Sequence, residues 1–399
     1  MTDASDLAQG YPLAGLKVLD FSRVLAGPFA GRMLSDLGAD VVKVEPPDGD
    51  VTRQWGAVIG GIPGYFCQQN AGKRNICIDL RADGACELVF ELVREADILI
   101  ENYRPDVMSR LGIGYAELSA VNPRLIMLSI SGFGHDGPES HRPAYAPIVH
   151  AETGLIGRQA RRNDIAYCDM PLSVADTNAS LHGLVGLLAA VIHRQTSNVG
   201  QHIDIAMIDA TVVTDDQIHY DLEDSEATGP LKNDTWETGA GPILVSADFR
   251  WLWRLCTAEH NLIADPTTKD MDLDAKIAMR RAKMGEFMKR LDSFEAIEKI
   301  MNEMNIAWGR VRDPVSIREQ ETVIARGTIA QIDDRAGGTR PIPQSPYRFS
   351  QAQSGVRGPA HHRGEDNEAV LTEWLSKSPL DVDGLLDAGV LSGDDEFLG

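Results

Sequence analysis

Basic side chains are scarce in this 399-residue sequence, which carries 38 Lys and Arg against 59 Asp and Glu and a formal net charge of -21. A surface of that sign repels phosphate backbones and anionic lipid headgroups, so neither nucleic acid nor a membrane is an expected partner. A small polyanion can still bind, but only where local arginines and lysines outweigh the overall field.

Cysteine is also sparse, with five residues, an odd number, and no C-x-x-C pair. A disulfide framework is therefore not expected, and reduced thiols in the cytoplasm are the simplest interpretation. Long apolar runs are missing as well, because the longest candidate, residues 184–192, is about half of a membrane span. The first ten residues lack the basic and apolar parts of a signal peptide, which favours a cytoplasmic location.

The sequence also lacks a dinucleotide-binding motif and a metal-binding motif. No G-x-G-x-x-G follows the first expected strand, where residues 22–27 read SRVLAG, and this counts against a nicotinamide oxidoreductase. The histidines at 260, 361 and 362 have no convincing metal-ligand spacing, so no metal site is expected.

What the sequence does contain is an alternation of short apolar strands with amphipathic helices. We expect helices from Pro28, over 84–95, 105–111 and 176–193, and from 209. The helix over 176–193 is apolar nearly all round and is expected to be buried on all sides. The expected strands are 16–21, 40–45, 75–80, 97–101, 124–130 and 201–206. This order predicts an α/β fold with a parallel sheet, whose ligands bind at the carboxyl ends of the strands.

The character of the chain changes after residue 222. Residues 223–237 read as a polar linker, 248–313 as mainly helical, and 335–357 as a loop that returns the chain. The length favours two domains. We therefore predict a large domain of residues 1–222 plus 335–399, built from both chain ends, and a smaller inserted domain of residues 223–334 with its linkers.

Asp176 precedes the strongest helix signal in the chain. Aspartate at that place is a favoured N-cap, because its carboxylate accepts a hydrogen bond from a free backbone N–H of the first turn. The pattern alone therefore predicts a structural role for this residue.

Several ordered blocks change that interpretation. They are PLAGLKVLDF (12–21), VLAGP (24–28), LGADVVKVEP (37–46), GKRNICIDL (72–80), ADILIENYRP (96–105), GFG (132–134), DTN (176–178) and GQ (200–201). Together, in this order and at this spacing, they resemble the family III CoA-transferases over about residues 12–222 and 340–392. The resemblance implies a Rossmann-like large domain, an inserted small domain and two chains threaded through each other as interlocked rings in a homodimer.

The resemblance also implies a chemistry, in which CoA moves from an acyl-CoA to a free carboxylic acid. Asp176 matches the family's nucleophile, and a carboxylate suits this reaction because its anhydride and thioester intermediates lie close in energy. Coenzyme A is then the only expected cofactor, bound as a co-substrate, and no metal is needed.

Positions carried over from the family place eight residues around CoA: Arg23, Ala26, Ile78, Arg81, Asn102, Tyr103, Val107 and Arg110. Further basic candidates for its phosphates are Arg53, Lys73, Arg74 and Arg104.

The acyl pocket departs from the family. Leu25 stands where many members have glutamine, and residues 239–242 are a poor match to the glycine-rich loop that shields the intermediate. Tyr145 occupies the place of a histidine in the related 2-methylacyl-CoA racemases, which favours transfer over racemisation. His141 and His150 leave a displaced base open, although each is expected to be a loop or surface residue. A racemase or isomerase on the same fold and a non-catalytic CoA-binding protein therefore stay as alternatives.

Overall fold

The structure, a computed structural model, describes residues 10–223 and 233–394. The chain forms two units, one of Met1–Asp215 with Ile324–Gly399 and one of Asp216–Val323. The first unit thus combines both chain ends. Most of the polar linker expected at 223–237 lies outside the described residues, as do residues 1–9, on which the expectation about a signal peptide rests.

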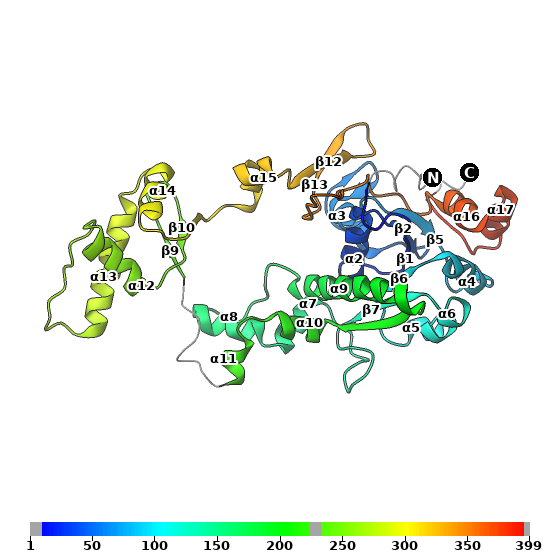
Figure 1. The fold of residues 1–399 in the computed structure, drawn as a ribbon, viewed down its shortest axis with the longest axis horizontal. Helices are drawn as coiled ribbons and strands as arrows, with labels where there is room; N and C mark the ends of the chain where they lie inside the picture. The colour runs from blue at the N-terminus through cyan, green and yellow to red at the C-terminus, as the bar shows by residue number, and fades with distance from the viewer. Residues whose placement is uncertain (1–9, 224–232, 395–399) are drawn as a thin grey trace. The chain divides into compact units, whose positions relative to one another are not determined.

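Six parallel strands form the centre of the first unit (Figure 1). They are β1 (Lys17–Asp20), β2 (Asp40–Glu45), β5 (Arg74–Cys77), β6 (Ile98–Glu101), β7 (Ile126–Ser131) and β8 (Gln201–Ala206). Their order in the sheet is β5-β2-β1-β6-β7-β8, so the strand order reverses between β1 and β6. This is the Rossmann-like order 3-2-1-4-5-6, and the expected α/β fold with a parallel sheet is confirmed.

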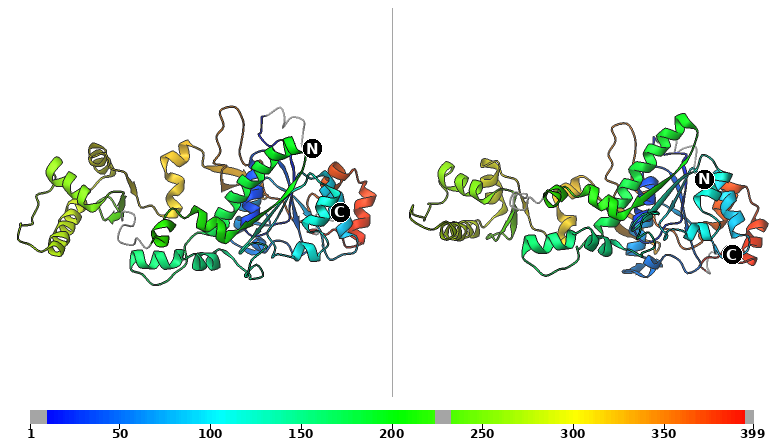
Figure 2. Two further views of the ribbon diagram at one scale, coloured as in Figure 1. Left: turned by 60° about the horizontal axis from the view of Figure 1, so that its bottom comes forward. Right: turned by 90° about the horizontal axis from the view of Figure 1, so that it is seen from below.

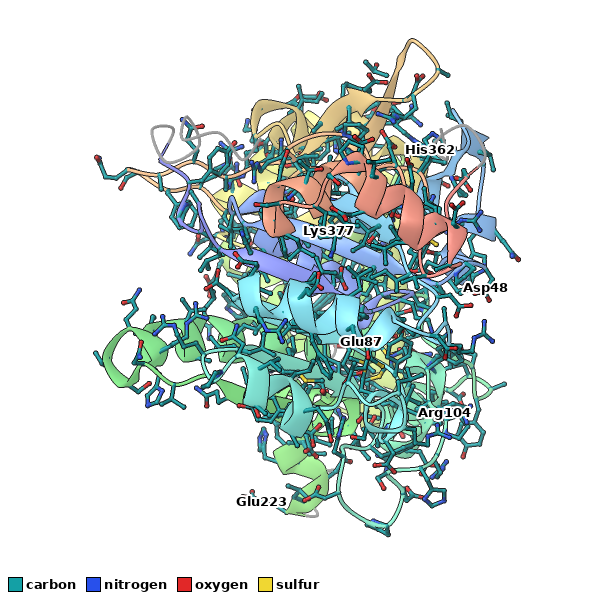
Figure 3. All side chains as sticks on the ribbon, turned by 90° about the vertical axis from the view of Figure 1, so that its right-hand side faces the viewer. Asp48, Glu87, Arg104, Glu223, His362 and Lys377 are labelled. Atoms are coloured by element: carbon teal, nitrogen blue, oxygen red, sulfur yellow. The ribbon has the colours of Figure 1, made fainter. Side chains whose placement is uncertain are left out.

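Helices cover both faces of this sheet, as the apolar strands require. On one face lie α2 (Ala26–Asp36), α7 (Ala146–Glu152), α9 (Val174–Ser197) and α10 (Met207–Thr214), packed in one apolar core. On the other lie α4 (Ala85–Glu95), α6 (Tyr115–Val121), α16 (Asn367–Leu375) and α17 (Pro379–Asp387). Figure 3 looks onto this second face, where Glu87 marks α4 and Lys377 marks the end of α16.

The long helix α9 runs along the sheet (Figure 2), but the prediction that it is buried on all sides is wrong. Leu184 and Leu187 pack in the core, whereas Val185 and Ile192 are each 66% exposed. The reason is that one stripe of a helix is enough to cover a sheet, and the opposite stripe is left exposed among the residues that the structure describes. By length and apolar composition α9 could also cross a membrane, a test that core helices of soluble proteins pass too.

Helix α2 begins at Ala26, two residues before the expected start at Pro28. Several helices of this unit were not expected, among them α6, α7 and α8 (Leu155–Asn163); residues 146–163, for example, have few of the apolar repeats that signal a helix. The remaining short elements of this unit are β3 (Val58–Ile59), β4 (Ile62–Pro63), α3 (Gly64–Asn70), α5 (Val107–Arg110), α15 (Glu321–Ala325, at its boundary), β12 (Ile329–Asp333) and β13 (Thr339–Pro343).

The second unit has its own apolar core. It contains α11 (Ile218–Leu222), α12 (Phe249–Arg254), α13 (Leu273–Lys289) and α14 (Phe294–Glu303), in line with the helical character of its sequence. It also contains an antiparallel sheet of β9 (Asp234–Trp236), β10 (Ile243–Val245) and β11 (Trp308–Arg310). These strands are only three residues long, too short to show an alternating pattern.

Candidate active site

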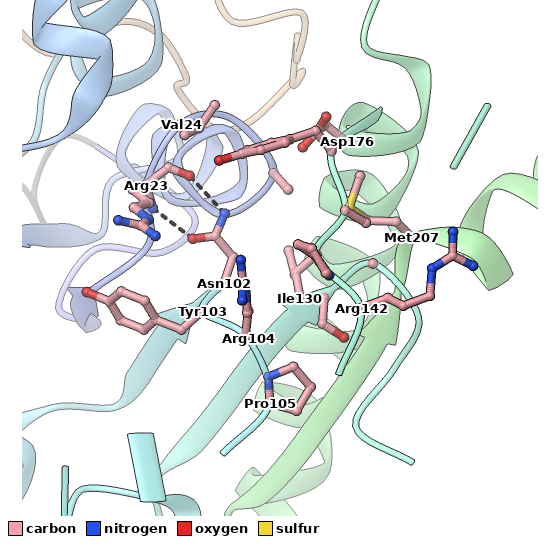
Figure 4. A pocket seen from close by; sticks show the side chains of 16 residues that line it. Arg23, Val24, Asn102, Tyr103, Arg104, Pro105, Ile130, Arg142, Asp176 and Met207 are labelled. Carbon is pink, nitrogen blue, oxygen red and sulfur yellow. Dashed lines mark hydrogen bonds between the residues drawn. The ribbon is translucent and has the colours of Figure 1, made fainter. Parts of the chain in front are cut away.

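A cavity of about 120 Å³ opens at the carboxyl ends of β1 and β6, where the strand order reverses (Figure 4). The loop after β1 supplies Arg23 and Ala26, and the turn after β6 supplies Asn102 to Pro105. The end of β7, residues 142–145 before α7, Met207 at the start of α10, and Asp176 complete the lining. A ligand site is expected at this place in an open parallel sheet.

Asp176 lies in the first turn of α9, three residues after the N-cap Ser173, so the prediction that it is itself the N-cap is wrong. The backbone N–H groups of Ala26 and Ala146 lie near its carboxylate and lower its pKa. These are the first residues of α2 and α7, so two helix N-termini point their N–H groups at one carboxylate.

Burial raises the pKa of Asp176 to about 6, against the opposing effects of these N–H groups and of His150. Desolvation disfavours the charged form, so the carboxylate is ionised at neutral pH but poorly solvated. A weakly solvated anion that borders a cavity is well suited to attack an electrophile.

Backbone strain lies next to this site. Val24 has a φ of 70°, a left-handed conformation that a β-branched residue rarely adopts. Asp50 stabilises it by accepting the Val24 N–H at 3.1 Å, and Lys43 pairs with Asp50 at 3.2 Å. The strained turn ends at Leu25, the N-cap of α2, and thereby directs the Ala26 N–H toward Asp176. The side chain of Leu25 is only 7% exposed and does not line the cavity.

A second cavity, of about 260 Å³, borders the first and shares Arg23 and Tyr103 with it. Lys43 and Arg81 also line it, and the Arg81 side chain is 78% exposed and pairs with Asp79 at 3.3 Å. Several carboxylates line the same cavity. Two of them, Glu45 and Asp50, are held by buried or half-buried cations.

The structure brings together some of the predicted CoA residues and leaves others apart. Arg23, Ala26, Asn102, Tyr103 and Arg81 line one or both cavities. Ile78 is fully buried in the apolar core, and Val107 and Arg110 of α5 line neither cavity.

Three of the further basic candidates hold the fold rather than a free anion. Lys73 is fully buried and pairs with Asp20 at 2.7 Å. Arg53 forms a two-pronged pair with Glu45. Arg74 pairs with Asp40 and Glu373. Arg104 differs from them, since it lines the first cavity.

His150 was expected in a loop or at the surface, and that expectation is wrong. It lies on α7 and is fully buried beneath the start of α9. Its Nε2 accepts the backbone N–H of Ala175 at 3.2 Å, and its Nδ1 bonds Asp169 at 2.9 Å. No local motif indicates this role, because the contacts join residues 19 and 25 positions apart.

Tyr65 of α3 is a second residue that the sequence did not single out. Burial and the charges of Asp176 and Asp50 raise its pKa, which places it in the field of the Asp176 carboxylate. Tyr145 is 63% exposed at the N-cap of α7 and lines the cavity. Among residues 10–223 and 233–394, no group of three or more His, Cys, Asp or Glu could hold a metal ion.

The fold and site define a Rossmann-like α/β protein with a half-buried carboxylate, that of Asp176, at the switch point of its sheet. The model of CoA-transferase family III matches residues 13–367, and the chain belongs to this family.

Relatives support this assignment. The acetyl-CoA:oxalate CoA-transferase of Acetobacter aceti is 40% identical over 213 residues, which are 53% of this chain and 55% of that protein. The succinate–glutarate CoA-transferase of Agrobacterium fabrum is 39% identical over 219 residues, 52% of this chain and 54% of its own length. The chain thus spans about half the length of these two relatives.

Other matches cover nearly the whole chain. The human succinyl-CoA:glutarate CoA-transferase is 26% identical over 409 residues, 97% of this chain and 91% of its own. A crystal structure of a CAIB/BAIF family protein from Brucella suis superposes with a TM-score of 0.78 at 28% identity. It covers 92% of this chain and 100% of that one.

Proposed function

We propose that the protein transfers CoA from an acyl-CoA to a free carboxylic acid through a covalent intermediate on Asp176. The observation that carries the proposal is the state of this carboxylate, which borders the switch-point cavity, has a pKa raised to about 6 and faces the N-termini of α2 and α7. Membership in CoA-transferase family III supports the same reaction.

The reaction divides into reversible exchanges at carbonyl carbons. An oxygen of Asp176 attacks the thioester carbonyl, the C–S bond breaks, and a mixed anhydride and a CoA thiolate result. The thiolate attacks the aspartyl carbonyl and releases the first acid, leaving an aspartyl–CoA thioester. The second acid reverses these two steps and leaves with CoA, so that Asp176 is regenerated.

Backbone N–H groups supply the stabilisation that these steps need. Each tetrahedral intermediate carries negative charge on a former carbonyl oxygen, and fixed donors near that oxygen lower the barrier. The N–H groups of Ala26 and Ala146 already interact with the Asp176 carboxylate. In this proposal they hold the aspartyl oxygen in both of its covalent states.

CoA is placed across the two adjoining cavities. Arg23 and Tyr103 line both, and the guanidinium carbon of Arg23 lies 5.7 Å from the centre of the Tyr103 ring. The thiol end then reaches Asp176 in the first cavity. The nucleotide end occupies the second, where Arg81 is exposed enough to exchange Asp79 for a phosphate.

The acids of the named relatives are small: oxalate in one and glutarate in two. A small carboxylic acid is accordingly our proposed acceptor, and the cavity of about 120 Å³ beside Asp176 supports it.

Racemisation has less support in this site. It needs a second proton-exchanging group across the α-carbon from the aspartate. Among the described residues that line the first cavity there is no histidine, and both ring nitrogens of His150 are engaged. Tyr145 borders the cavity, and a phenol is a poor proton-exchanging group near neutral pH. A purely CoA-binding protein would not need a half-buried carboxylate with a raised pKa at this place.

We further propose a cytoplasmic, interlocked homodimer. The support, besides the family, is the exposed apolar stripe of α9, with Val185 and Ile192, and Val213 of α10 at 71% exposure. A second copy of the chain would bury these side chains, and light scattering on the purified protein measures the oligomeric state.

The covalent step is tested by trapping. The protein is incubated with acyl-CoAs of short acids, treated with hydroxylamine or borohydride, digested and analysed by mass spectrometry. We expect a modification at Asp176 that requires the acyl-CoA and is absent from the Asp176→Asn protein. An unmodified Asp176 in a protein that transfers CoA would contradict the mechanism.

A further inference from the structure

The start of α9 is capped by a side chain from another helix. Ser173, the N-cap, makes no side-chain capping hydrogen bond. The N–H of Ala175, which has no partner within its own helix, donates instead to Nε2 of His150 at 3.2 Å. His150 thus replaces the missing local cap, and it does so at the residue directly before Asp176.

This contact fixes the tautomer of His150. Because Nε2 accepts a hydrogen bond, the ring proton must lie on Nδ1, which faces Asp169 Oδ1 at 2.9 Å. Asp169 therefore selects the tautomer that can cap α9. The ring is 0% exposed, so water does not replace the contact when the histidine is removed.

Helix α7 holds the nucleophile in two ways at once. Its first residue, Ala146, offers an N–H to the Asp176 carboxylate, and one turn later its His150 accepts the N–H that precedes Asp176. The side chain and the backbone of the first turn of α9 are thereby fixed to the same element.

We propose that His150, held by Asp169, is a positioning residue for Asp176. It does not exchange protons with the substrate, and acts by fixing the first turn of α9 so that the carboxylate stays between the N-termini of α2 and α7. The inference rests on the proposed function, because its kinetic consequence presumes that Asp176 is the nucleophile.

The test compares His150→Leu, which removes the acceptor, with His150→Gln, whose side-chain oxygen can reach the place of Nε2. His141→Leu is the matched control, because His141 is an exposed histidine in the segment before α7. We expect His150→Leu to lower kcat about 10- to 100-fold with a small change in KM, since a small displacement of a reacting group has that effect. His150→Gln should recover most of the rate.

Hydrogen exchange gives a readout independent of activity. Peptides that contain the Ala175 amide should exchange faster in His150→Leu and near the wild-type rate in His150→Gln. Unchanged exchange, or faster exchange with a wild-type kcat, would overturn the inference. If His150→Leu does not fold, His150→Asn, whose shorter side chain does not reach Ala175, replaces it. A wild-type protein that transfers no CoA from any donor contradicts the proposed function instead, while the exchange rates still report on the cap.

Discussion

Asn102 joins the two loops that flank the switch point by clasping the backbone of Arg23. Its Oδ1 accepts the Arg23 N–H at 2.8 Å, and its Nδ2 donates to the Arg23 carbonyl at 2.8 Å (dashed in Figure 4). Just beyond the ends of β1 and β6, the Asn102 side chain thus makes two hydrogen bonds to the Arg23 backbone, as a neighbouring strand would. It fixes the place of Arg23, which lines both cavities.

Removing this clasp should weaken CoA binding more than catalysis. We expect Asn102→Ala to raise KM for the acyl-CoA about 5- to 30-fold, because two hydrogen bonds of about 1 kcal/mol each are lost. Asn102→Asp keeps the acceptor but not the donor and should lie between. Asn163→Ala, at an exposed asparagine that bonds only within α8, is the control. Equal losses in kcat for both Asn102 variants, with unchanged KM, would contradict a binding role.

Asp176 should show a conflict between stability and activity. Its pKa is raised to about 6 from 3.8, so the folded state holds the proton more tightly, and stability falls as pH rises through 6. Asp176→Asn removes this effect. We expect the variant to be inactive, yet about 2 kcal/mol more stable than the wild type at pH 8 and nearly equal at pH 4. Denaturant unfolding at both pH values measures this, and a destabilised Asp176→Asn at pH 8 would count against it.

The same pKa predicts the pH dependence of the reaction. The nucleophile must be ionised, so kcat/KM should rise between about pH 5 and pH 7 with an apparent pKa near 6. Asp176→Glu should move that limb or remove activity, whereas Tyr145→Phe should leave it in place. If the acid limb of the kcat/KM profile stays at the same pH in an active Asp176 variant, the titrating group is not Asp176.

The local sequence pattern was sufficient to predict the central sheet of the first unit. The alternation of apolar strands and helices predicted all six strands of the parallel sheet, and the strands at 40–45 and 201–206 have the expected bounds. The strand order and the switch point were not predicted, because the right-handed crossover rule is compatible with more than one order. The ordered motif blocks singled out both Asp176 and the first loop, and the two line the same cavity.

The rest of the site depends on contacts between distant residues, which no local pattern carries. The burial of His150 and the two N–H groups at Asp176 arise only when α2, α7 and α9 pack together. The strain at Val24 is likewise imposed from outside, by Asp50. A positive charge in the sequence does not reveal its partner either. Lys73 was a candidate phosphate ligand, but in the structure it pairs with Asp20 in the core.

Lys73 should therefore matter for folding and not for CoA. Lys73→Met leaves Asp20 buried without its cation, and we expect the free energy of unfolding to fall by about 3–5 kcal/mol. Arg81→Ala is the opposite case: an exposed side chain whose removal should raise KM for CoA thioesters and leave stability nearly unchanged. Paired measurements of unfolding and KM distinguish the two roles, and a Lys73→Met protein of wild-type stability would contradict ours.

Glu101, at the end of β6, should also make the free energy of unfolding depend on pH. Burial raises its pKa to about 7 from 4.5, and its Oε2 accepts the Tyr103 N–H at 2.7 Å next to the clasp. Because the pKa is higher in the folded state, protonated Glu101 stabilises the fold fully below about pH 4.5. This stabilisation is lost as pH rises through 7. Glu101→Gln keeps an oxygen for Tyr103 but does not titrate. We expect its stability relative to the wild type to increase by about 3 kcal/mol between pH 4 and pH 8. Glu87→Gln, on the exposed side of α4, should show no such trend, and parallel curves for Glu101→Gln and the wild type would refute the raised pKa.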